Sequence, residues 1–154
     1  MKEVTLCYIR QNGAYLMLYR NKKKNDPNEG KWIGIGGKVE PLETPDQCIL
    51  REVREETDLT LTDCTPRGVV YFHSDCCDDE KMYLFSATSF QGTLTDSCNE
   101  GELAWISEEN LFSLPMWEGD RVFLEPLIAG EKWIELALYY SGDTLVKIER
   151  ENPC

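Results

Sequence analysis

The segment GKVEPLETPDQCILREVREETDL, residues 37–59, carries most of the information in this sequence. Glu52, Glu55 and Glu56 stand at helical offsets of zero, three and four, so their carboxylates fall within about 100° on one helix face. Like charges this close repel one another by roughly a few tenths of a kcal/mol per pair. A hard divalent cation such as Mg²⁺, which prefers oxygen ligands, would relieve that repulsion. Three acids alone are also typical of a solvated helix face, and this alternative stays open here.

The same segment contains the start signals of a helix over about Pro45–Thr57. Thr44 suits the N-cap, Pro45 suits the first helical position, and Gln47 completes a capping box with Thr44. An apolar stripe beside the acids is formed by Ile49 and Val53 and extended by Leu50. We therefore expect one edge of the helix to pack into a core and the next to face a cleft. Glycines precede the helix in GIGGKVE, residues 34–40, where the backbone can approach a ligand closely.

The complete spacing resembles the Nudix box, G-x5-E-x7-R-E-U-x-E-E-x-G-U, in which U is aliphatic. Eight of its nine specified positions match, namely Gly37, Glu43, Arg51, Glu52, Val53, Glu55, Glu56 and Leu59. The departure is Asp58, where the box has a glycine suited to a left-handed helix terminus; Asp tolerates that conformation better than most residues. Two further segments, residues 30–40 and 114–127, are similar to those of the MutT-like oxidised-purine nucleoside triphosphatase group.

The resemblance implies a catalytic Mg²⁺ site, with Mn²⁺ as an alternative ion. The metal ligands it assigns are Glu52, Glu55, Glu56 and a backbone carbonyl near Gly36 or Gly37, for which we take Gly37. Arg51 would orient a catalytic glutamate and pair with Glu43, and the general base is left open among Glu52, Glu56 and Glu100. Glu100 is a further acid that reaches the metal in relatives, although a surface acid in a polar turn is an equal alternative. Glu102 is a weaker candidate on the same strand face.

On the substrate side, the resemblance implies that Trp117 stacks on the base and that Asp120 hydrogen-bonds to its edge. The remaining expected substrate-binding residues are Lys23, Ile33, Gly36, Gly37 and Lys38. Ile33 stands where related enzymes have an asparagine that hydrogen-bonds the base, and isoleucine lacks that ability. We therefore expect weaker discrimination between oxidised and normal purines. The alternatives are core packing for Trp117, a helix N-terminal charge for Asp120 and a solvated loop for Lys23. Phe72 and Met82 are expected in the core in preference to the pocket lining.

Composition predicts one globular domain over residues 1–154, with 42% hydrophobic and 29% charged residues. No apolar run approaches the roughly 20 residues that span a bilayer, and the N-terminus lacks a signal-peptide pattern, so we expect no membrane partner and a cytoplasmic location. Seven cysteines without a C-x-x-C pair favour reduced thiols. A net charge of −12 argues against stable nucleic-acid binding but permits a nucleotide bridged by metal.

Alternating apolar patterns predict strands at residues 3–10, 14–20, 68–74, 81–90, 102–106, 132–140 and 144–148. A helical turn is expected at 107–111 and a second helix at 119–129. This mixture predicts an α+β protein, and the resemblance specifies the Nudix fold, an α/β/α sandwich around a mixed β-sheet.

The leading functional hypothesis is a Mg²⁺-dependent pyrophosphohydrolase of modified nucleoside triphosphates such as 8-oxo-dGTP. The enzymatic alternative is hydrolysis of another nucleoside-diphosphate-linked substrate, such as a sugar nucleotide or a capped RNA end. The non-enzymatic alternative is a nucleotide sensor, which would have no need for all the metal ligands. A monomer and a homodimer are both compatible with the sequence.

Overall fold

The computed structural model describes residues 1–150, which form ten strands, two α-helices and one 3-10 helix. In chain order the elements are β1 (Lys2–Gln11), β2 (Ala14–Arg20), β3 (Trp32–Ile33), α1 (Pro45–Thr57), β4 (Thr60–Leu61), β5 (Thr65–Ser74), β6 (Glu80–Ala87), β7 (Phe90–Gln91), β8 (Gly101–Ser107), η1 (Glu108–Ser113), α2 (Glu118–Ile128), β9 (Ile134–Ser141) and β10 (Thr144–Arg150).

A mixed sheet runs in the order β10-β9-β5-β6-β1-β2-β3, with β8 on the other edge of β2. The β1–β6 and β5–β9 pairs are parallel, and the remaining pairs are antiparallel. β1 and β2 pair only beside their turn, at Arg10–Tyr15 and Gln11–Ala14. Beyond those residues the two strands diverge, and the segment after β3 takes the vacated place, with Ile35 bonded to Cys7 in both directions at 2.7 and 3.1 Å.

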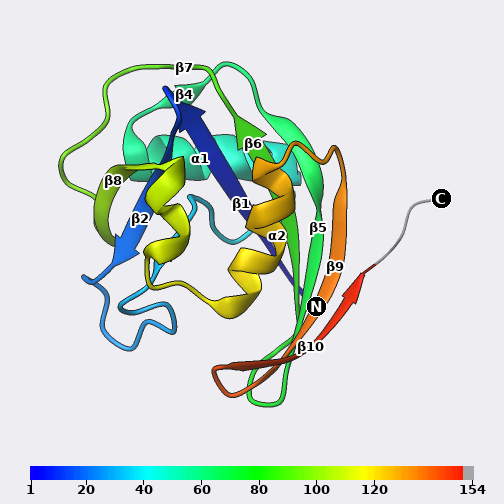
Figure 1. Cartoon of the computed structure of the whole chain (residues 1–154). Helices are drawn as coiled ribbons and strands as arrows, with labels where there is room; N and C mark the ends of the chain where they lie inside the picture. The colour runs from blue at the N-terminus through cyan, green and yellow to red at the C-terminus, as the bar shows by residue number, and fades with distance from the viewer. Residues whose placement is uncertain (151–154) are drawn as a thin grey trace.

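Helices α1 and α2 lie on opposite faces of this sheet (Figure 1). The core beneath α1 contains Ile49, Val53, Leu16, Leu18 and Phe85. The core beneath α2 contains Phe123, Leu124, Tyr8, Met17 and Leu84. Alternation along β2 explains the division, because Leu16 and Leu18 face α1 whereas Met17 faces α2. The predicted α/β/α sandwich is confirmed.

The predicted bounds of α1 are confirmed at both ends. Thr44 accepts a hydrogen bond from the amide of Gln47 at 3.1 Å, and the Gln47 side chain accepts one from the amide of Thr44 at 2.9 Å. Asp58 ends the helix in the left-handed region, with φ of 66°, as its place in the motif predicts. The prediction that Leu50 extends the apolar stripe is wrong, because Leu50 is 45% exposed whereas Ile49 and Val53 are fully buried.

The strand predicted at 81–90 is interrupted after Ala87. Asp63 accepts hydrogen bonds from the amides of Thr88 and Ser89 at 2.8–3.2 Å, which bends the chain out of β6. The two-residue strands β4 and β7, which pair beyond that bend, carry no periodic pattern and were not expected. The Asn12–Gly13 turn of the first hairpin is confirmed, with both residues at positive φ.

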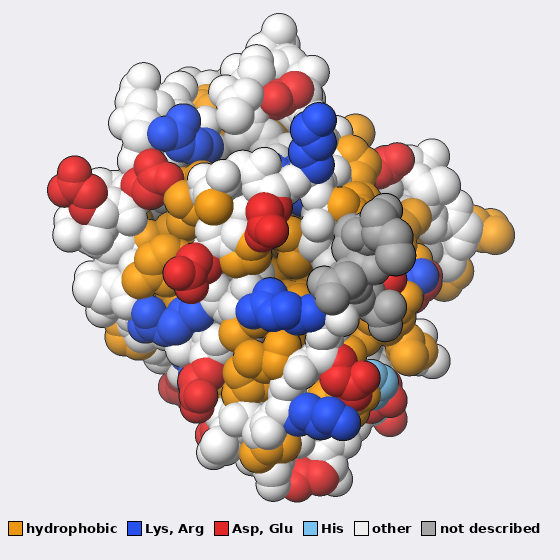
Figure 2. All heavy atoms as spheres, turned by 45° about the vertical axis from the view of Figure 1, so that its right-hand side comes forward, with side chains coloured by type: hydrophobic (Ala, Val, Ile, Leu, Met, Phe, Trp, Pro, Cys, Tyr) orange, Lys and Arg blue, Asp and Glu red, His pale blue; other side chains and the backbone are white. Residues whose placement is uncertain are grey.

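The charged residues do not form a single patch on the face that carries α2 and β10. Figure 2 shows basic and acidic side chains interspersed there with apolar ones. Within residues 1–150, neither helix has the length and apolar composition needed to cross a membrane.

The buried edge of α1 gives a direct test of the fold. Val53→Asp should lower the free energy of unfolding by about 4 kcal/mol or more, because it places an unpaired charge in the core. Leu50→Asp, on the exposed side of the same helix, should change it by about 0.5 kcal/mol or less. Thermal melts of both variants give the comparison. A Val53→Asp melt at the wild-type temperature would show that α1 is placed wrongly.

Candidate active site

The acids of α1 are organised by the guanidinium of Arg51. Its Nε and Nη2 donate to the two oxygens of Glu43 at 2.7 and 3.0 Å, a bidentate pair that lowers the pKa of Glu43 to about 2. Its Nη1 donates to Glu52 at 2.8 Å and to Glu55 at 3.2 Å. Nη2 also donates to the carbonyl of Lys38 at 3.2 Å, so Arg51 fixes both the helix acids and the loop that precedes them.

Three carboxyl groups, those of Glu52, Glu56 and Glu100, are near enough to shift one another's pKa, and Glu52 links them to Arg51. Burial raises the pKa of Glu56 well above its usual value, and the neighbouring Glu100 and Glu52 carboxylates raise it further. Burial also raises the pKa of Glu52, against the opposing effect of Arg51. The Oε2 atom of Glu56 is buried and has no hydrogen-bond partner. A buried, unpartnered carboxylate oxygen among other carboxylates is a site that a cation would stabilise.

Glu100 reaches this group from the loop before β8. Lys23 Nζ lies 3.3 Å and Arg20 Nη1 3.6 Å from its carboxylate, and Arg20 is itself held by Asp26 at 2.8 Å. The pKa of Glu100 is lowered, first by the Glu56 carboxyl and then, against burial, by the two cations. Glu102 instead accepts from Asn21 at 3.2 Å on the exposed surface. The structure therefore favours Glu100 over Glu102 as the further acid of the site. It places Lys23 in an ion pair with Glu100.

The donor set fits a hard divalent cation, which takes oxygen ligands. Glu52, Glu56 and Glu100 supply carboxylates, whereas Glu55 lies at the rim, with 60% of its side chain exposed and its carboxylate on Arg51. In the part of the chain that the structure describes, no three such side chains are already arranged as a metal site, so the carboxylates would turn toward an arriving ion. The Gly37 carbonyl accepts from the amide of Thr5 at 2.8 Å, which favours Gly36 for the backbone oxygen.

The glycines of the segment before α1 allow close contacts that a side chain would block. A Cβ on Gly37 would meet the carboxylate of Glu52, and a Cβ on Gly36 would overlap the carbonyl of Thr5. A Cβ on Gly34 would lie 3.1 Å from the Tyr8 ring. One short segment therefore contacts Glu52 at one end and Tyr8 at the other. Lys38, which follows it, is exposed.

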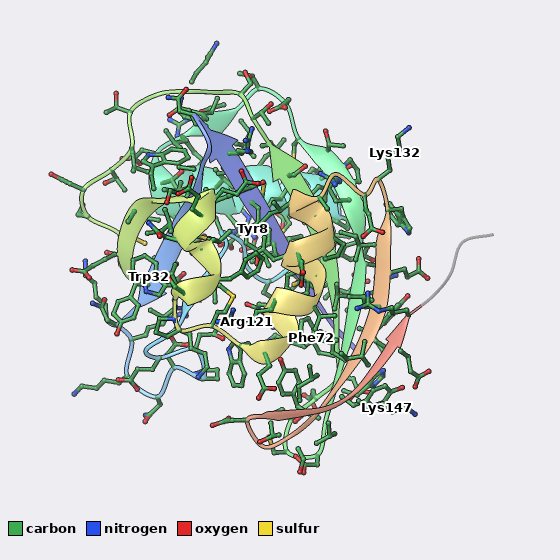
Figure 3. All side chains as sticks on the ribbon, in the orientation of Figure 1. Tyr8, Trp32, Phe72, Arg121, Lys132 and Lys147 are labelled. Carbon is green, nitrogen blue, oxygen red and sulfur yellow. The ribbon has the colours of Figure 1, made fainter. Side chains whose placement is uncertain are left out.

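A second polar group, which we call the Tyr8 cluster, consists of Tyr8, Trp117, Asp120 and Tyr140. Figure 3 shows Tyr8 on β1 between η1 and α2. Its hydroxyl is buried without a hydrogen-bond partner, and burial and then Asp120 raise its pKa. Burial raises the pKa of Asp120 to about 7, opposed by Lys31. Trp117 is edge-on to Tyr140, with 5.6 Å between ring centroids, and Lys31 Nζ lies 4.2 Å from the Trp117 ring.

The structure thus brings Trp117 and Asp120 together, but it separates Ile33 from them. Ile33 packs against the core beneath α1, whereas its neighbour Trp32 packs against the core beneath α2. Met82 is buried in the α2-side core, and Phe72 packs against its edge. Sequence reasoning missed Tyr8, whose only signal is a polar-tipped ring inside the apolar run of β1. Two of its neighbours, Phe123 and Asp120, come from α2, which the sequence does not place beside it.

A surface hollow lies along the start of β8. It is lined by Lys22, Trp32, Thr95, Asp96, Cys98 and residues 101–104, the segments that flank Glu100. Lys22 Nζ donates to the carbonyl of Cys98 at 2.9 Å and holds the rim. A second hollow lies over the outer side of α2, beside Arg121 and Glu125, away from the acids. No residue of α1 lines either hollow, so the cleft expected beside the acidic helix edge stays a prediction.

Comparison with known proteins identifies a family. The model of the NUDIX domain matches residues 2–127. An oxidized purine nucleoside triphosphate hydrolase from Danio rerio is 26% identical over 150 residues, which cover 95% of this chain and 92% of that protein. A CTP pyrophosphohydrolase from Escherichia coli is 30% identical over 131 residues, covering 84% and 93%. The mutator MutT protein from Bacillus halodurans has the same fold, with a TM-score of 0.88, 23% identity and 97% of each chain covered.

The two loop glycines should respond differently to an added methyl group. Gly37→Ala should keep the fold and lower turnover by about tenfold or more, because it displaces the flexible Glu52 carboxylate. Gly36→Ala should instead lower the melting temperature, because its methyl meets the rigid backbone of β1. Circular dichroism melts and turnover assays separate the two effects. If Gly37→Ala had the melting temperature and the turnover of the wild type, Glu52 would not belong to the catalytic site.

Asp120 should make stability depend on pH between about 4 and 7. Its pKa is raised from 3.8 to about 7 in the folded protein, so the folded state holds a proton that the unfolded state has lost. The free energy of unfolding should fall as pH rises across this window, by at most about 4 kcal/mol, and level off above it. The difference between wild type and Asp120→Asn, measured in urea at several pH values, isolates the effect. A difference that is constant from pH 4 to 8 would contradict the buried placement.

Proposed function

This chain belongs to the NUDIX domain family, and we propose that it is a Mg²⁺-dependent pyrophosphohydrolase of nucleoside triphosphates that carry an oxidised or otherwise modified base. As a Nudix hydrolase it acts on the phosphoric anhydride bonds of nucleotides. The products would be the nucleoside monophosphate and pyrophosphate.

The observation that carries this proposal is the buried Glu56 oxygen without a partner, beside Glu52 and Glu100. A non-catalytic nucleotide sensor would gain nothing from a buried Glu56 carboxyl whose pKa is raised by burial and then by Glu100 and Glu52. A phosphate chain held by that cation would lie near Gly37, whose lack of a side chain lets the Glu52 carboxylate approach the loop. When bound, Mg²⁺ would neutralise phosphate oxygens and lower the pKa of a water molecule.

The protein's own groups position the reaction. Arg51 fixes the orientation of Glu52 through a 2.8 Å hydrogen bond, and Glu43 fixes Arg51. Arg20 and Lys23 set the position of Glu100. Glu52 keeps one oxygen on Arg51, so its other oxygen can accept a proton from an attacking water, which supports Glu52 over Glu56 as the general base.

The Tyr8 cluster supports selection of the nucleobase of the substrate. The Tyr8 hydroxyl and the Asp120 carboxyl are buried polar groups that gain from hydrogen bonds to a base edge, and Trp117 offers a ring face. A site with such unpaired groups rejects ligands that cannot satisfy them. We propose that discrimination between bases depends on this cluster and not on Ile33, which packs beneath α1.

The related Danio rerio hydrolase is named for oxidised purine triphosphates and the Escherichia coli enzyme for CTP, so the substrate panel must separate these classes. We propose a panel of 8-oxo-dGTP, dGTP, dATP, CTP, ADP-ribose, a sugar nucleotide and a capped RNA, with Mg²⁺ and with separate detection of pyrophosphate and phosphate. The highest kcat/KM should be for a modified purine triphosphate, with release of pyrophosphate. A preference for CTP or for a diphosphate-linked compound would contradict the proposed substrate class, and no turnover at all would support a nucleotide sensor.

Glu56→Gln should lower kcat by about 100-fold or more at saturating Mg²⁺ without loss of fold, because the amide removes a charged oxygen ligand. Glu109→Gln, an exposed glutamate on η1, is the matched control and should turn over like wild type. The measurement is steady-state kinetics on the preferred substrate. Wild-type turnover by Glu56→Gln would mean that the converging acids do not hold the catalytic cation.

A further inference from the structure

Two adjacent cysteines, Cys76 and Cys77, stand at the tip of the loop between β5 and β6. Both are exposed, and their sulfurs are 3.1 Å apart. They lie outside the acids of α1 and outside the Tyr8 cluster, and nothing in the proposed hydrolysis uses them. Among the cysteines that the structure describes, Cys7, Cys48 and Cys98 are buried and Cys64 is partly buried, so this pair is the accessible one.

The loop that carries the pair is fixed on both sides. Asp75 accepts from the hydroxyl of Ser141 at 2.9 Å and from the amide of Gly142 at 3.1 Å, which joins the loop to the β9–β10 turn. The two turns lie side by side at the bottom of Figure 1. Asp79 lies 2.9 Å from His73, and its carbonyl accepts from the amide of Lys2 at 3.1 Å. The sulfurs are therefore held near each other before any ligand arrives.

Neighbouring groups also shift the pKa values of the two thiols. The amide of Cys76 donates to Ser74 Oγ at 3.2 Å, and the same hydroxyl lies 3.3 Å from the Cys76 sulfur. The Ser74 hydroxyl, and then the Cys77 thiol, lower the pKa of Cys76, whereas Cys76 raises the pKa of Cys77. A lowered pKa makes the Cys76 thiolate, which is the nucleophilic form, easier to generate, and the Cys77 thiol beside it can then bind the same atom.

The geometry favours a bridging ligand over a disulfide. Consecutive Cα atoms are about 3.8 Å apart, which is shorter than the roughly 4.4–6.8 Å usual for disulfides, so a bond between the two sulfurs is strained. Zinc prefers four ligands, and across residues 1–150 no third His, Cys, Asp or Glu completes a metal site with them. A ligand that needs only two protein sulfurs fits best.

We propose that Cys76 and Cys77 form a two-sulfur binding site for trivalent organoarsenicals, which are thiophilic compounds of a metalloid. With phenylarsine oxide, two arsenic–sulfur bonds form and the arsenic–oxygen bond breaks. Both thiol protons leave with that oxygen as water, and no electron is transferred. The arsenic keeps its phenyl group as the third substituent, so the protein supplies the two sulfurs and no further ligand.

The test is intact-mass spectrometry of the folded, reduced protein with stoichiometric phenylarsine oxide in excess monothiol. We expect one adduct per chain, with loss of one water, that a small dithiol removes and a monothiol does not. Cys76→Ser and Cys77→Ser should each abolish it, because a single sulfur gives only the labile adduct. Cys64→Ser and Cys154→Ser are the matched controls and should retain it.

Retention of the adduct in Cys76→Ser or Cys77→Ser, its loss in a control variant, or its removal by monothiol would each overturn the proposal. Native mass and a circular dichroism spectrum of each variant show whether the fold persists, and the exposed position of both residues predicts that it does. The readout is binding alone, so it stands or falls independently of the hydrolase activity.

Discussion

The candidate active site depends on one guanidinium. Arg51 binds both oxygens of Glu43, one oxygen each of Glu52 and Glu55, and the carbonyl of Lys38. Without a positive charge at that point the acids would repel one another and the loop would lose its attachment to α1. Lysine would preserve the charge but not the fork of donors that holds two carboxylates and a carbonyl together.

The glycine segment, residues 34–37, connects the acids of α1 to the Tyr8 cluster. At Gly37 the absent side chain leaves room for the Glu52 carboxylate, and at Gly34 it leaves room for the ring of Tyr8. The diverging ends of β1 and β2 make space for the segment in the sheet. A triphosphate near the acids and a base near Tyr8 and Asp120 would therefore be joined by the same stretch of backbone.

The sequence predicts best what depends on neighbours in the chain. The capping box, the bounds of α1 and the left-handed Asp58 follow from local chemistry, and all are confirmed. Leu50 was predicted wrongly because periodicity gives the direction of a stripe but not its width. Tyr8 was missed because its partner Asp120 lies more than 100 residues away in the sequence. Glu100 could be proposed from the resemblance, but only the fold shows that it lies beside the α1 acids.

We propose that these acids form a cation site before any nucleotide binds. Electron paramagnetic resonance of Mn²⁺ titrated into the nucleotide-free protein measures this directly, since bound and free Mn²⁺ differ in signal. We expect one bound ion in the wild type and binding weaker by about tenfold or more in Glu56→Gln. Equal binding by the two proteins, or none by the wild type, would contradict it.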